Sequence, residues 1–350
     1  MKFDIFCKVI DNYGDAGVCL RLSRGLIQKG HTVKLICDNT QTLNKIANDS
    51  DKNLIDMQNW SDNLTFNDTD VVVLAFSCRP SDEVINNIAK SNVLTVNLEY
   101  LSAESWVEDC HGLRSFADNL NCYYFFPGFT RKTGGLIIED DFIAKVSNKK
   151  LTDTDNTRYI SLFSYKNDNL KTVLKILSKS KKHNIVTVFE GLALDNLNAL
   201  LNINLKAGQS YSFENFTFNA HSMVPQPQYD DILINSDLNL VRGEDSIVRA
   251  MLTGNIFLWQ IYYQEENAHI IKLNDFIDRM GEATDADPKL FDMFRTLNNM
   301  YNSNGTIDPE NFNYDIFENN FKIQTQKWSE YLLNQPSLTD SLIEFCAKKI

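Results

Sequence analysis

Residues 3–37 read FDIFCKVIDNYGDAGVCLRLSRGLIQKGHTVKLIC, and this stretch decides the fold class. Residues 3–10 are a largely apolar run of strand length, residues 18–29 follow a helical pattern that Gly30 ends, and residues 31–37 are a second apolar run. A strand, a loop, a helix and a second strand in this order make the unit from which parallel sheets are built, with helices on their faces. The beginning of the chain therefore predicts an α/β domain.

The same alternation of short apolar runs and helical patterns continues along the chain. Residues 70–76 and 93–98 are further predicted strands, and the polar, charged stretch at 139–157 marks the end of the first domain. Because a chain of 350 residues exceeds what one core usually supports, two domains are the natural expectation. We place an N-terminal Rossmann-like domain over residues 1–150 and a second domain over 151–335.

The second half of the chain repeats this rhythm and then turns helical. Its predicted strands are residues 159–165, 185–189, 216–220, 238–241 and 256–261, and the pattern is almost wholly helical from Glu266 onward. Two Rossmann-like domains that face a central cleft, closed by C-terminal helices, make the GT-B architecture of glycosyltransferases, although other two-domain α/β proteins share the pattern. We expect the last helix, within residues 336–350, to pack back on the first domain.

Composition limits the classes of function. The chain contains 34 lysines and arginines against 46 aspartates and glutamates, and the resulting net charge of −12 disfavours nucleic acid as a partner. Charges at Lys2, Asp4 and Lys8 interrupt any signal peptide or membrane span at the N-terminus. The 7 cysteines are widely spaced and include no CxxC pair, which indicates neither a disulfide framework nor a zinc site. We therefore expect a cytoplasmic protein without a membrane segment.

Familiar cofactor motifs are missing or weak. Neither GxGxxG nor GxxxxGKS/T occurs, so a dinucleotide fingerprint and a P-loop are both excluded. Asp-x-Asp occurs at 68–70, 153–155 and 285–287, each in a polar turn where aspartate is common, and the 5 histidines show no metal-ligand spacing. Cys110 and His111 would suggest a cysteine nucleophile, but neighbours in sequence rarely face each other in a fold. No metal or other cofactor is predicted.

The loop at residues 11–17 is the first candidate site. It follows the first predicted strand and carries two carboxylates, Asp11 and Asp15. Ligands of open α/β sheets collect at the carboxyl ends of strands, where a carboxylate can serve as a general base. The structural alternative makes Asp15 a helix N-cap and Gly14 a turn residue.

Residues 240–246, with the sequence LVRGEDS, are the second candidate site. They leave a predicted strand, turn at a glycine and enter a helix. The unpaired N–H groups and the dipole of a helix N-terminus suit a diphosphate, and Arg242 adds a cation. Glu244 and Asp245 would repel a phosphate unless they face hydroxyl groups instead. A well-capped helix with an exposed arginine is the structural alternative.

Further candidates lie at predicted strand ends in the second domain. Residues 223–227, with the sequence MVPQP, form an extended loop in which an amide such as Gln226 can pair with the edge of a nucleotide base. Tyr165 and Tyr262 each follow a predicted strand. A stiffened loop and ordinary core or rim tyrosines are the alternatives.

These segments, taken in order, resemble the bacterial protein-arginine rhamnosyltransferases of elongation factor P. The resemblance rests on residues 11–15 (DNYGD), 97–102 (NLEYLS), 126–129 (FPGF), 133–136 (TGGL), 224–227 (VPQP), 241–246 (VRGEDS) and 259–262 (WQIY). It spans most of the chain, and the order and spacing are more specific than any single motif. The resemblance implies a GT-B fold and an inverting transfer of L-rhamnose from dTDP-β-L-rhamnose to an arginine side chain of elongation factor P, without a metal.

Carried over position by position, the resemblance implies roles at the candidate sites. The catalytic base corresponds to Asp15, with Asp11 as the carboxylate that helps to hold the acceptor guanidinium, and Glu244 matches a glutamate important for activity. The donor-binding positions are Arg242 and Tyr262 at the diphosphate, Asp245 and Ser246 at the ribose or phosphates, and Tyr165 and Gln226 around the nucleotide. Met223 stands where the family pattern usually has a phenylalanine stacked on thymine, and its polarizable sulfur can still contact a ring face.

Two other interpretations stay open at this point. Another GT-B glycosyltransferase or a nucleotide-sugar epimerase, acting on a small-molecule or envelope acceptor, would share the donor site without needing the paired aspartates. A non-catalytic two-domain protein would use the same carboxylates only as helix caps.

Overall fold

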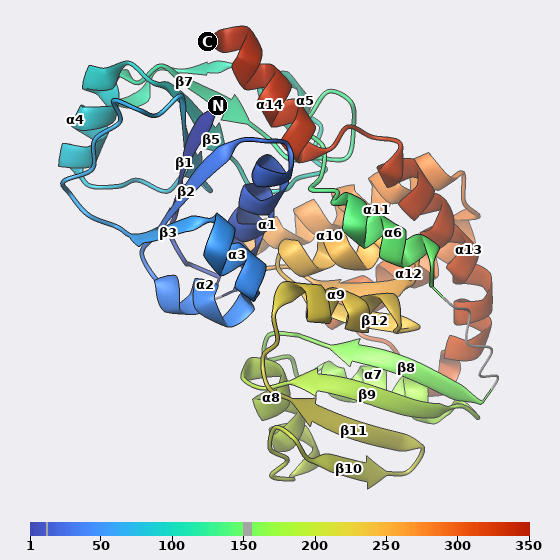
Figure 1. Cartoon of the computed structure of the whole chain (residues 1–350). Helices are drawn as coiled ribbons and strands as arrows, with labels where there is room; N and C mark the ends of the chain where they lie inside the picture. The colour runs from blue at the N-terminus through green and yellow to red at the C-terminus, as the bar shows by residue number, and fades with distance from the viewer. Residues whose placement is uncertain (12, 150–155) are drawn as a thin grey trace. The chain divides into compact units, whose positions relative to one another are not determined.

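The computed structural model describes residues 1–11, 13–149 and 156–350. These residues form two compact units, one of Met1–Asp140 with Leu333–Ile350 and the other of Asp141–Leu332, and each unit is built around its own sheet (Figure 1). The chain therefore completes the second unit before its C-terminal segment returns to the first.

The second unit begins before the predicted boundary at residue 151. Helix α6 (Asp140–Ser147) occupies the first part of the segment predicted as a linker. Phe142 on this helix is buried, and the Arg249 guanidinium lies 4.8 Å from the centroid of its ring. This contact ties α6 to the second unit. Residues 150–155, which hold the Asp-x-Asp motif at 153–155, lie outside the described residues.

The first sheet has the strand order β3-β2-β1-β4-β5-β7-β6. Its strands are β1 (Lys2–Cys7), β2 (Thr32–Cys37), β3 (Asp56–Asn59), β4 (Val71–Ala75), β5 (Leu94–Leu98), β6 (Arg114–Ser115) and β7 (Cys122–Phe125). Neighbouring strands are parallel except β6 and β7. The order reverses between β1 and β4, and ligands of open α/β sheets bind at such a switch point, beyond the carboxyl ends of the strands.

Strand β1 is covered on both faces. Phe3, Ile5 and Cys7 lie in one core with α1 (Gly14–Gln28), and Phe6 lies in a second core with α4 (Asp82–Ser91). Successive side chains of a strand point to opposite faces, so a nearly continuous apolar run predicts this two-sided burial. The shorter helices of the unit are α2 (Thr40–Ile46), α3 (Asp49–Leu54) and α5 (Trp106–Cys110).

The C-terminal helix α14 (Leu338–Lys349) packs against α1 in the first unit, as Figure 1 shows. Its residues Leu338 and Leu342 are buried in the same core as Phe3. The two helices approach closely at Gly25, where an added Cβ atom would lie 2.6 Å from Thr339 Oγ1. The glycine therefore makes this packing possible.

The second sheet has the strand order β10-β11-β9-β8-β12-β13. Its strands are β8 (Thr157–Leu162), β9 (His183–Phe189), β10 (Ser210–Phe213), β11 (Phe216–His221), β12 (Leu238–Arg242) and β13 (Ile256–Gln260). Within this sheet, the pair of β10 and β11 is antiparallel, and the other paired strands that the structure describes are parallel. The order reverses between β8 and β12, which gives this sheet a switch point of its own.

Helices complete the second unit, and several of them bury aromatic side chains. They are α7 (Leu170–Ser178), α8 (Leu192–Leu201), α9 (Gln226–Ile234), α10 (Asp245–Leu252), α11 (Ala268–Thr284), α12 (Pro288–Tyr301) and α13 (Tyr314–Leu333). Phe294 stacks on Phe321 with ring centroids 4.4 Å apart, which joins α12 to α13. Within the described ranges, no helix combines the length and the apolar character that crossing a membrane requires.

Element boundaries differ from the sequence-based prediction mainly beside the candidate sites. Helix α1 begins at Gly14 rather than at residue 18, so Asp15 lies in its first turn instead of in a loop. Helix α9 begins at Gln226, so this residue lies in the first turn of a helix rather than in the extended loop predicted over residues 223–227. Strands β3, β6, β7 and β10 are not predicted, because runs of two to four residues carry too little periodicity.

Candidate functional site

The first candidate site lies just beyond the carboxyl end of β1, next to the switch point of the first sheet. Asp15 is 3% exposed. Its Oδ2 atom accepts hydrogen bonds from the backbone N–H groups of Ile10 and Asp11, each at 2.8 Å. The carboxylate therefore turns back onto the loop that enters α1. It does not cap the helix, whose N-cap residue is Tyr13.

The surroundings of Asp15 raise the pKa of its carboxyl group above the ordinary value. Burial is the main cause, because the charged form loses hydration. The N–H groups of Asp11 and Ile10 act in the opposite direction, and the negative charge of Asp38 adds to the rise. A carboxylate with a raised pKa is a stronger base than an ordinary aspartate, which suits proton abstraction.

Asp11 lies on the same loop as Asp15. Its carbonyl oxygen accepts a hydrogen bond from the Gly14 N–H at 2.7 Å, and a Cβ atom at position 14 would lie 2.8 Å from Asp11 Oδ2. Glycine at this position thus lets the Asp11 carboxylate approach the start of the helix. Asn12, the next member of the motif, lies outside the described residues.

Two further carboxylates lie at the same edge of the sheet. Asp38 belongs to no motif of the sequence, whereas Glu99 belongs to the motif at residues 97–102. Asp38 follows β2 and accepts the Val9 N–H at 2.9 Å. Glu99 follows β5 and accepts hydrogen bonds from Ser77 Oγ at 3.0 Å and Asn97 Nδ2 at 2.6 Å. Both carboxylates come directly after a parallel strand, and this position is the signal that could have identified Asp38.

The second candidate site lies at the carboxyl end of β12, next to the switch point of the second sheet. Arg242 is the last residue of β12 and is 6% exposed, so the alternative of an exposed arginine is wrong. Its guanidinium carbon lies 4.5 Å from the ring centroid of Phe163 and 4.7 Å from that of Tyr165. Its Nη1 atom has no hydrogen-bond partner among the residues that the structure describes. Because a buried guanidinium N–H without an acceptor is costly, this position favours an anionic ligand.

Phe163 is a residue that sequence reasoning missed. It is the first residue after β8 and stands two positions before Tyr165. Both rings pack on the same guanidinium. The spacing of Phe163 and Tyr165 can be read from the sequence, but their common contact with Arg242 cannot.

The turn between β12 and α10 directs backbone N–H groups toward the same edge. Gly243 has a φ of +61°, which glycine adopts without strain, and its carbonyl accepts the Trp259 Nε1–H at 2.8 Å. Glu244 is the N-cap residue of α10, and the hydroxyl of Ser246 donates a hydrogen bond to the Arg242 carbonyl. The positive end of the α10 dipole therefore lies close to the Arg242 main chain.

The first turns of α9 and α10 are joined by a side-chain hydrogen bond. Gln226 is 3% exposed, and its Nε2 donates to Asp245 Oδ2 at 3.1 Å. The backbone N–H of Met223 donates to Glu190 Oε1 at 3.0 Å. Glu190 directly follows β9 and is a further residue that the sequence does not single out. These contacts hold both predicted nucleotide residues at the carboxyl end of the sheet.

The two predicted tyrosines also meet there. Tyr165 donates its backbone N–H to Gln260 Oε1 at 2.9 Å, and its ring lies edge-on to that of Tyr262 with centroids 5.9 Å apart. Tyr262 is 45% exposed. The second unit thus gathers all the predicted donor-binding residues, together with Glu244, at one edge of its sheet, whereas Asp11 and Asp15 belong to the first unit.

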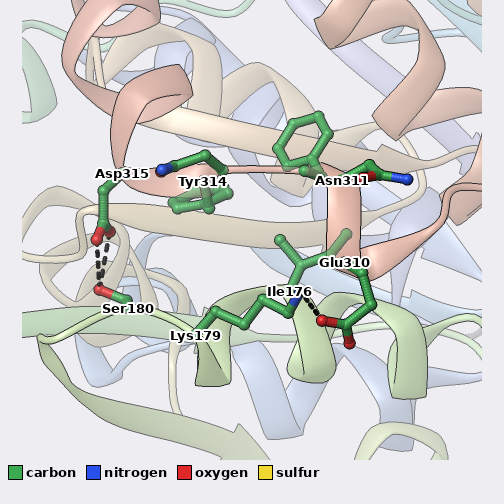
Figure 2. Close-up of a pocket in the computed structure, with 9 residues that line it drawn as sticks. Ile176, Lys179, Ser180, Glu310, Asn311, Tyr314 and Asp315 are labelled. Carbon is green, nitrogen blue, oxygen red and sulfur yellow. Dashed lines mark hydrogen bonds and ion pairs between the residues drawn. The ribbon is translucent and has the colours of Figure 1, made fainter.

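A cavity elsewhere in the second unit does not coincide with these residues. Figure 2 shows this cavity, of about 200 Å³, between the end of α7 and the start of α13. Its polar groups bind one another, with Lys179 Nζ 2.6 Å from Glu310 Oε2 and Ser180 Oγ 2.8 Å from Asp315 Oδ1. It lies near the amino ends of the strands, because β9 begins at His183, so the fold does not favour it as the ligand site. Across the described part of the chain, no group of three or more His, Cys, Asp or Glu side chains is arranged to hold a metal ion.

Solved structures define the class of protein. The chain is similar to a structure of EarP that addresses arginine glycosylation of translation elongation factor EF-P, with a TM-score of 0.68, 22% identity and coverage of 100% of this chain and 99% of the other. It is also similar to the spinosyn rhamnosyltransferase SpnG in complex with spinosyn aglycone, with a TM-score of 0.56, 11% identity and coverage of 98% and 99%. The chain therefore has the GT-B fold of glycosyltransferases.

Sequence comparisons narrow this class to one family. Residues 3–347 match the family described as Elongation-Factor P (EF-P) rhamnosyltransferase EarP. The chain is 33% identical to the protein-arginine rhamnosyltransferase of Pseudomonas putida, with 98% of each chain covered. It is 30% identical to that of Neisseria meningitidis, with coverage of 98% of this chain and 96% of the other. The chain belongs to the EarP family of protein-arginine rhamnosyltransferases, which confirms the resemblance of its motifs.

Proposed function

We propose that the chain transfers L-rhamnose from dTDP-β-L-rhamnose to an arginine side chain of elongation factor P, with inversion at the anomeric carbon. In this proposal the first unit holds the acceptor arginine and the second unit holds the nucleotide sugar. Membership of the EarP family supports the acceptor and the transferred sugar. A translation factor and a nucleotide sugar meet in the cytoplasm, where we place the reaction.

The acceptor chemistry requires carboxylates. An arginine guanidinium has a pKa of about 12.5–13.8, and its delocalised lone pairs make it a weak nucleophile at neutral pH. In the proposal, Asp11 and Asp15 orient the planar group, and Asp15 takes the proton as the nitrogen–carbon bond forms. The nitrogen becomes more acidic during attack, so a carboxylate is a sufficient base at that moment. Burial, which raises the pKa of Asp15, supports this role.

The donor chemistry requires positive charge at the departing diphosphate. As the nitrogen attacks the anomeric carbon, the carbon–oxygen bond to dTDP breaks on the opposite face, and the diphosphate gains negative charge. Arg242 and the N-terminus of α10 would stabilise this charge, with Tyr262 beside them and no metal in the scheme. The observation that supports the donor site best is the buried Nη1 of Arg242, which has no acceptor within the described residues.

The nucleotide would lie along the same edge of the sheet. Asp245 and Ser246 would contact the ribose or phosphates, and Tyr165 and Gln226 would surround the nucleotide. Gln226 is already oriented by its hydrogen bond to Asp245. Met223 would lie against the thymine, and Glu190 fixes the backbone of its loop. Glu244, the N-cap residue of α10, would act close to the transferred sugar.

One experiment separates this function from its alternatives. The purified chain is incubated with dTDP-β-L-rhamnose and elongation factor P, and the intact mass of the acceptor is measured. A gain of one deoxyhexose, lost when the acceptor arginine is changed to lysine, supports the proposal. Donor binding without any gain in mass would instead favour a glycosyltransferase with another acceptor, an epimerase or a non-catalytic binding protein.

A further inference from the structure

We infer that Asp38 is a positioning residue for the proposed base: its carboxylate holds the loop after β1 in the conformation that places Asp15. The inference rests on the proposed function. It adds a residue from a different strand, one that no motif of the sequence includes.

Three consecutive backbone N–H groups lie on the segment that follows β1. Those of Val9, Ile10 and Asp11 all point at carboxylate oxygens. Asp38 Oδ1 accepts the first at 2.9 Å, and Asp15 Oδ2 accepts the other two at 2.8 Å each. Two carboxylates therefore share the donors of one short segment, and the orientation of Asp15 depends on where that segment lies.

Asp38 is itself fixed to β1. The last paired residues of β1 and β2 are Cys7 and Cys37, and the backbone N–H of Asp38 donates to the Cys7 carbonyl at 3.3 Å. Its main chain thus continues the sheet, while its side chain reaches across to Val9. Asn39 follows and caps α2, with its side chain accepting the Thr42 N–H at 3.2 Å. A residue tethered on both sides can hold a neighbouring loop in register.

Asp38 also contributes charge at this site. The field of its negative charge raises the pKa of Asp15, in addition to the effect of burial. Three buried thiols also interact with Asp15, namely Cys7 on β1, Cys19 on α1 and Cys78 after β4. Asp11 lies on the same loop. Removing the charge of Asp38 should therefore lower the pKa of Asp15, whereas removing its hydrogen bond should displace the loop.

Two substitutions separate these effects. Asp38→Asn keeps an oxygen acceptor for the Val9 N–H but removes the charge, and Asp38→Ala removes both. Asp70 provides matched controls, because its Oδ2 accepts the Lys2 N–H at 2.7 Å at the opposite end of β1. Rates of rhamnose transfer to elongation factor P are measured as kcat and KM from pH 4.5 to 8.5, alongside the melting temperature of each variant.

We expect Asp38→Ala to lower kcat at least about fivefold, the effect of losing one net hydrogen bond at the proposed base. Asp38→Asn should keep most of the kcat that Asp38→Ala loses. The acid limb of the pH profile of Asp38→Asn should lie at lower pH than that of the wild type. Asp70→Asn and Asp70→Ala should leave the profile in place.

The inference is overturned if both Asp38 variants match the wild type in kcat and in pH profile, or if the Asp70 variants reproduce their effects. Should Asp38→Ala fail to fold, the pH profile of Asp38→Asn decides alone. If the wild-type chain does not modify elongation factor P, the proposed function fails, and the inference fails with it. Normal wild-type transfer combined with silent Asp38 variants overturns the inference only.

Discussion

The two sheets differ in how each stabilises a buried charge at the carboxyl ends of its strands. In the first unit, the Asp15 carboxylate is 3% exposed and receives two backbone hydrogen bonds. In the second unit, the Arg242 guanidinium is 6% exposed and packs between aromatic rings, with Nη1 lacking an acceptor within the described ranges. Backbone N–H groups thus satisfy the anion, whereas the described residues leave Nη1 of the cation without an acceptor.

This difference fits the two roles that the proposed reaction gives to Asp15 and Arg242. A base must be held in place before its substrate arrives, and backbone donors do that without adding a counter-charge that would lower its pKa further. A binding cation must keep hydrogen-bonding capacity for the ligand, and aromatic rings can hold it without using its N–H groups. In the proposed reaction, the same topology would therefore support a reacting group at one edge and an anion-binding group at the other.

The largest expected effect comes from removing the basicity of Asp15. Asparagine can still accept both backbone N–H groups, so Asp15→Asn should preserve the loop and lower the rate of rhamnose transfer by about 10²- to 10⁴-fold. Donor affinity, measured by calorimetry, should not change. Near-normal transfer by this variant would show that Asp15 is not the base.

The stability of this variant tests the sign of the pKa shift. Because the pKa of Asp15 is raised in the folded state, stability falls as the pH rises from the ordinary aspartate pKa through the raised one, and above the raised pKa the loss is complete. Asp15→Asn should then melt at the same or a higher temperature than the wild type at pH 7, although it should transfer rhamnose far more slowly. Asp70→Asn, an exposed change of the same kind, is the control for both measurements. A large loss of stability would mean that the carboxylate is needed to hold the loop.

The next effect concerns the donor. Arg242→Ala should weaken dTDP-β-L-rhamnose binding about 10- to 100-fold, the usual range for losing charge-assisted hydrogen bonds. Arg279→Ala, on the surface of the same unit, provides the control. Unchanged donor affinity in Arg242→Ala, measured by calorimetry, would place the diphosphate elsewhere. The proposed difference in role between the two buried charges would then be wrong.

The pH dependence of the reaction on the acid side should reflect the ionisation of Asp15 in the first unit. Asp15 acts only when ionised, and burial raises its pKa, so kcat/KM should begin to fall on acidification at a higher pH than an ordinary aspartate would allow. Donor affinity should not follow the same acid limb. Measuring both from pH 4.5 to 8.5 checks this, and an identical acid limb for binding would point to a group at the donor site.

The smallest effect is expected at Met223. A phenylalanine there can stack on the thymine, so Met223→Phe should tighten donor binding about two- to fivefold. The Glu190 hydrogen bond is made to the backbone of this residue and should survive the substitution. Unaltered or weaker binding would argue against a stacking deficit in this chain.

The sequence predicts a large part of the fold and of the candidate sites. Apolar runs in β1, β2 and β4, and the helical pattern of α1, fix the α/β class, because periodicity is a local property. The motifs that contain Asp11 and Arg242 fall at strand ends, where parallel sheets bind ligands. Short strands such as β6 and β10 escape prediction because their pairing partners, not their composition, define them.

By itself, then, the sequence determined the two Rossmann-like units, the family and the residue types at each candidate edge. Only the tertiary structure decided that Asp15 binds the loop rather than caps the helix, and that Phe163 shares the Arg242 guanidinium with Tyr165. It alone also brought Asp38 to Val9. These contacts join segments that are distant in sequence and that strand pairing and burial bring together. Neither burial nor the register between distant strands can be deduced from the local sequence pattern.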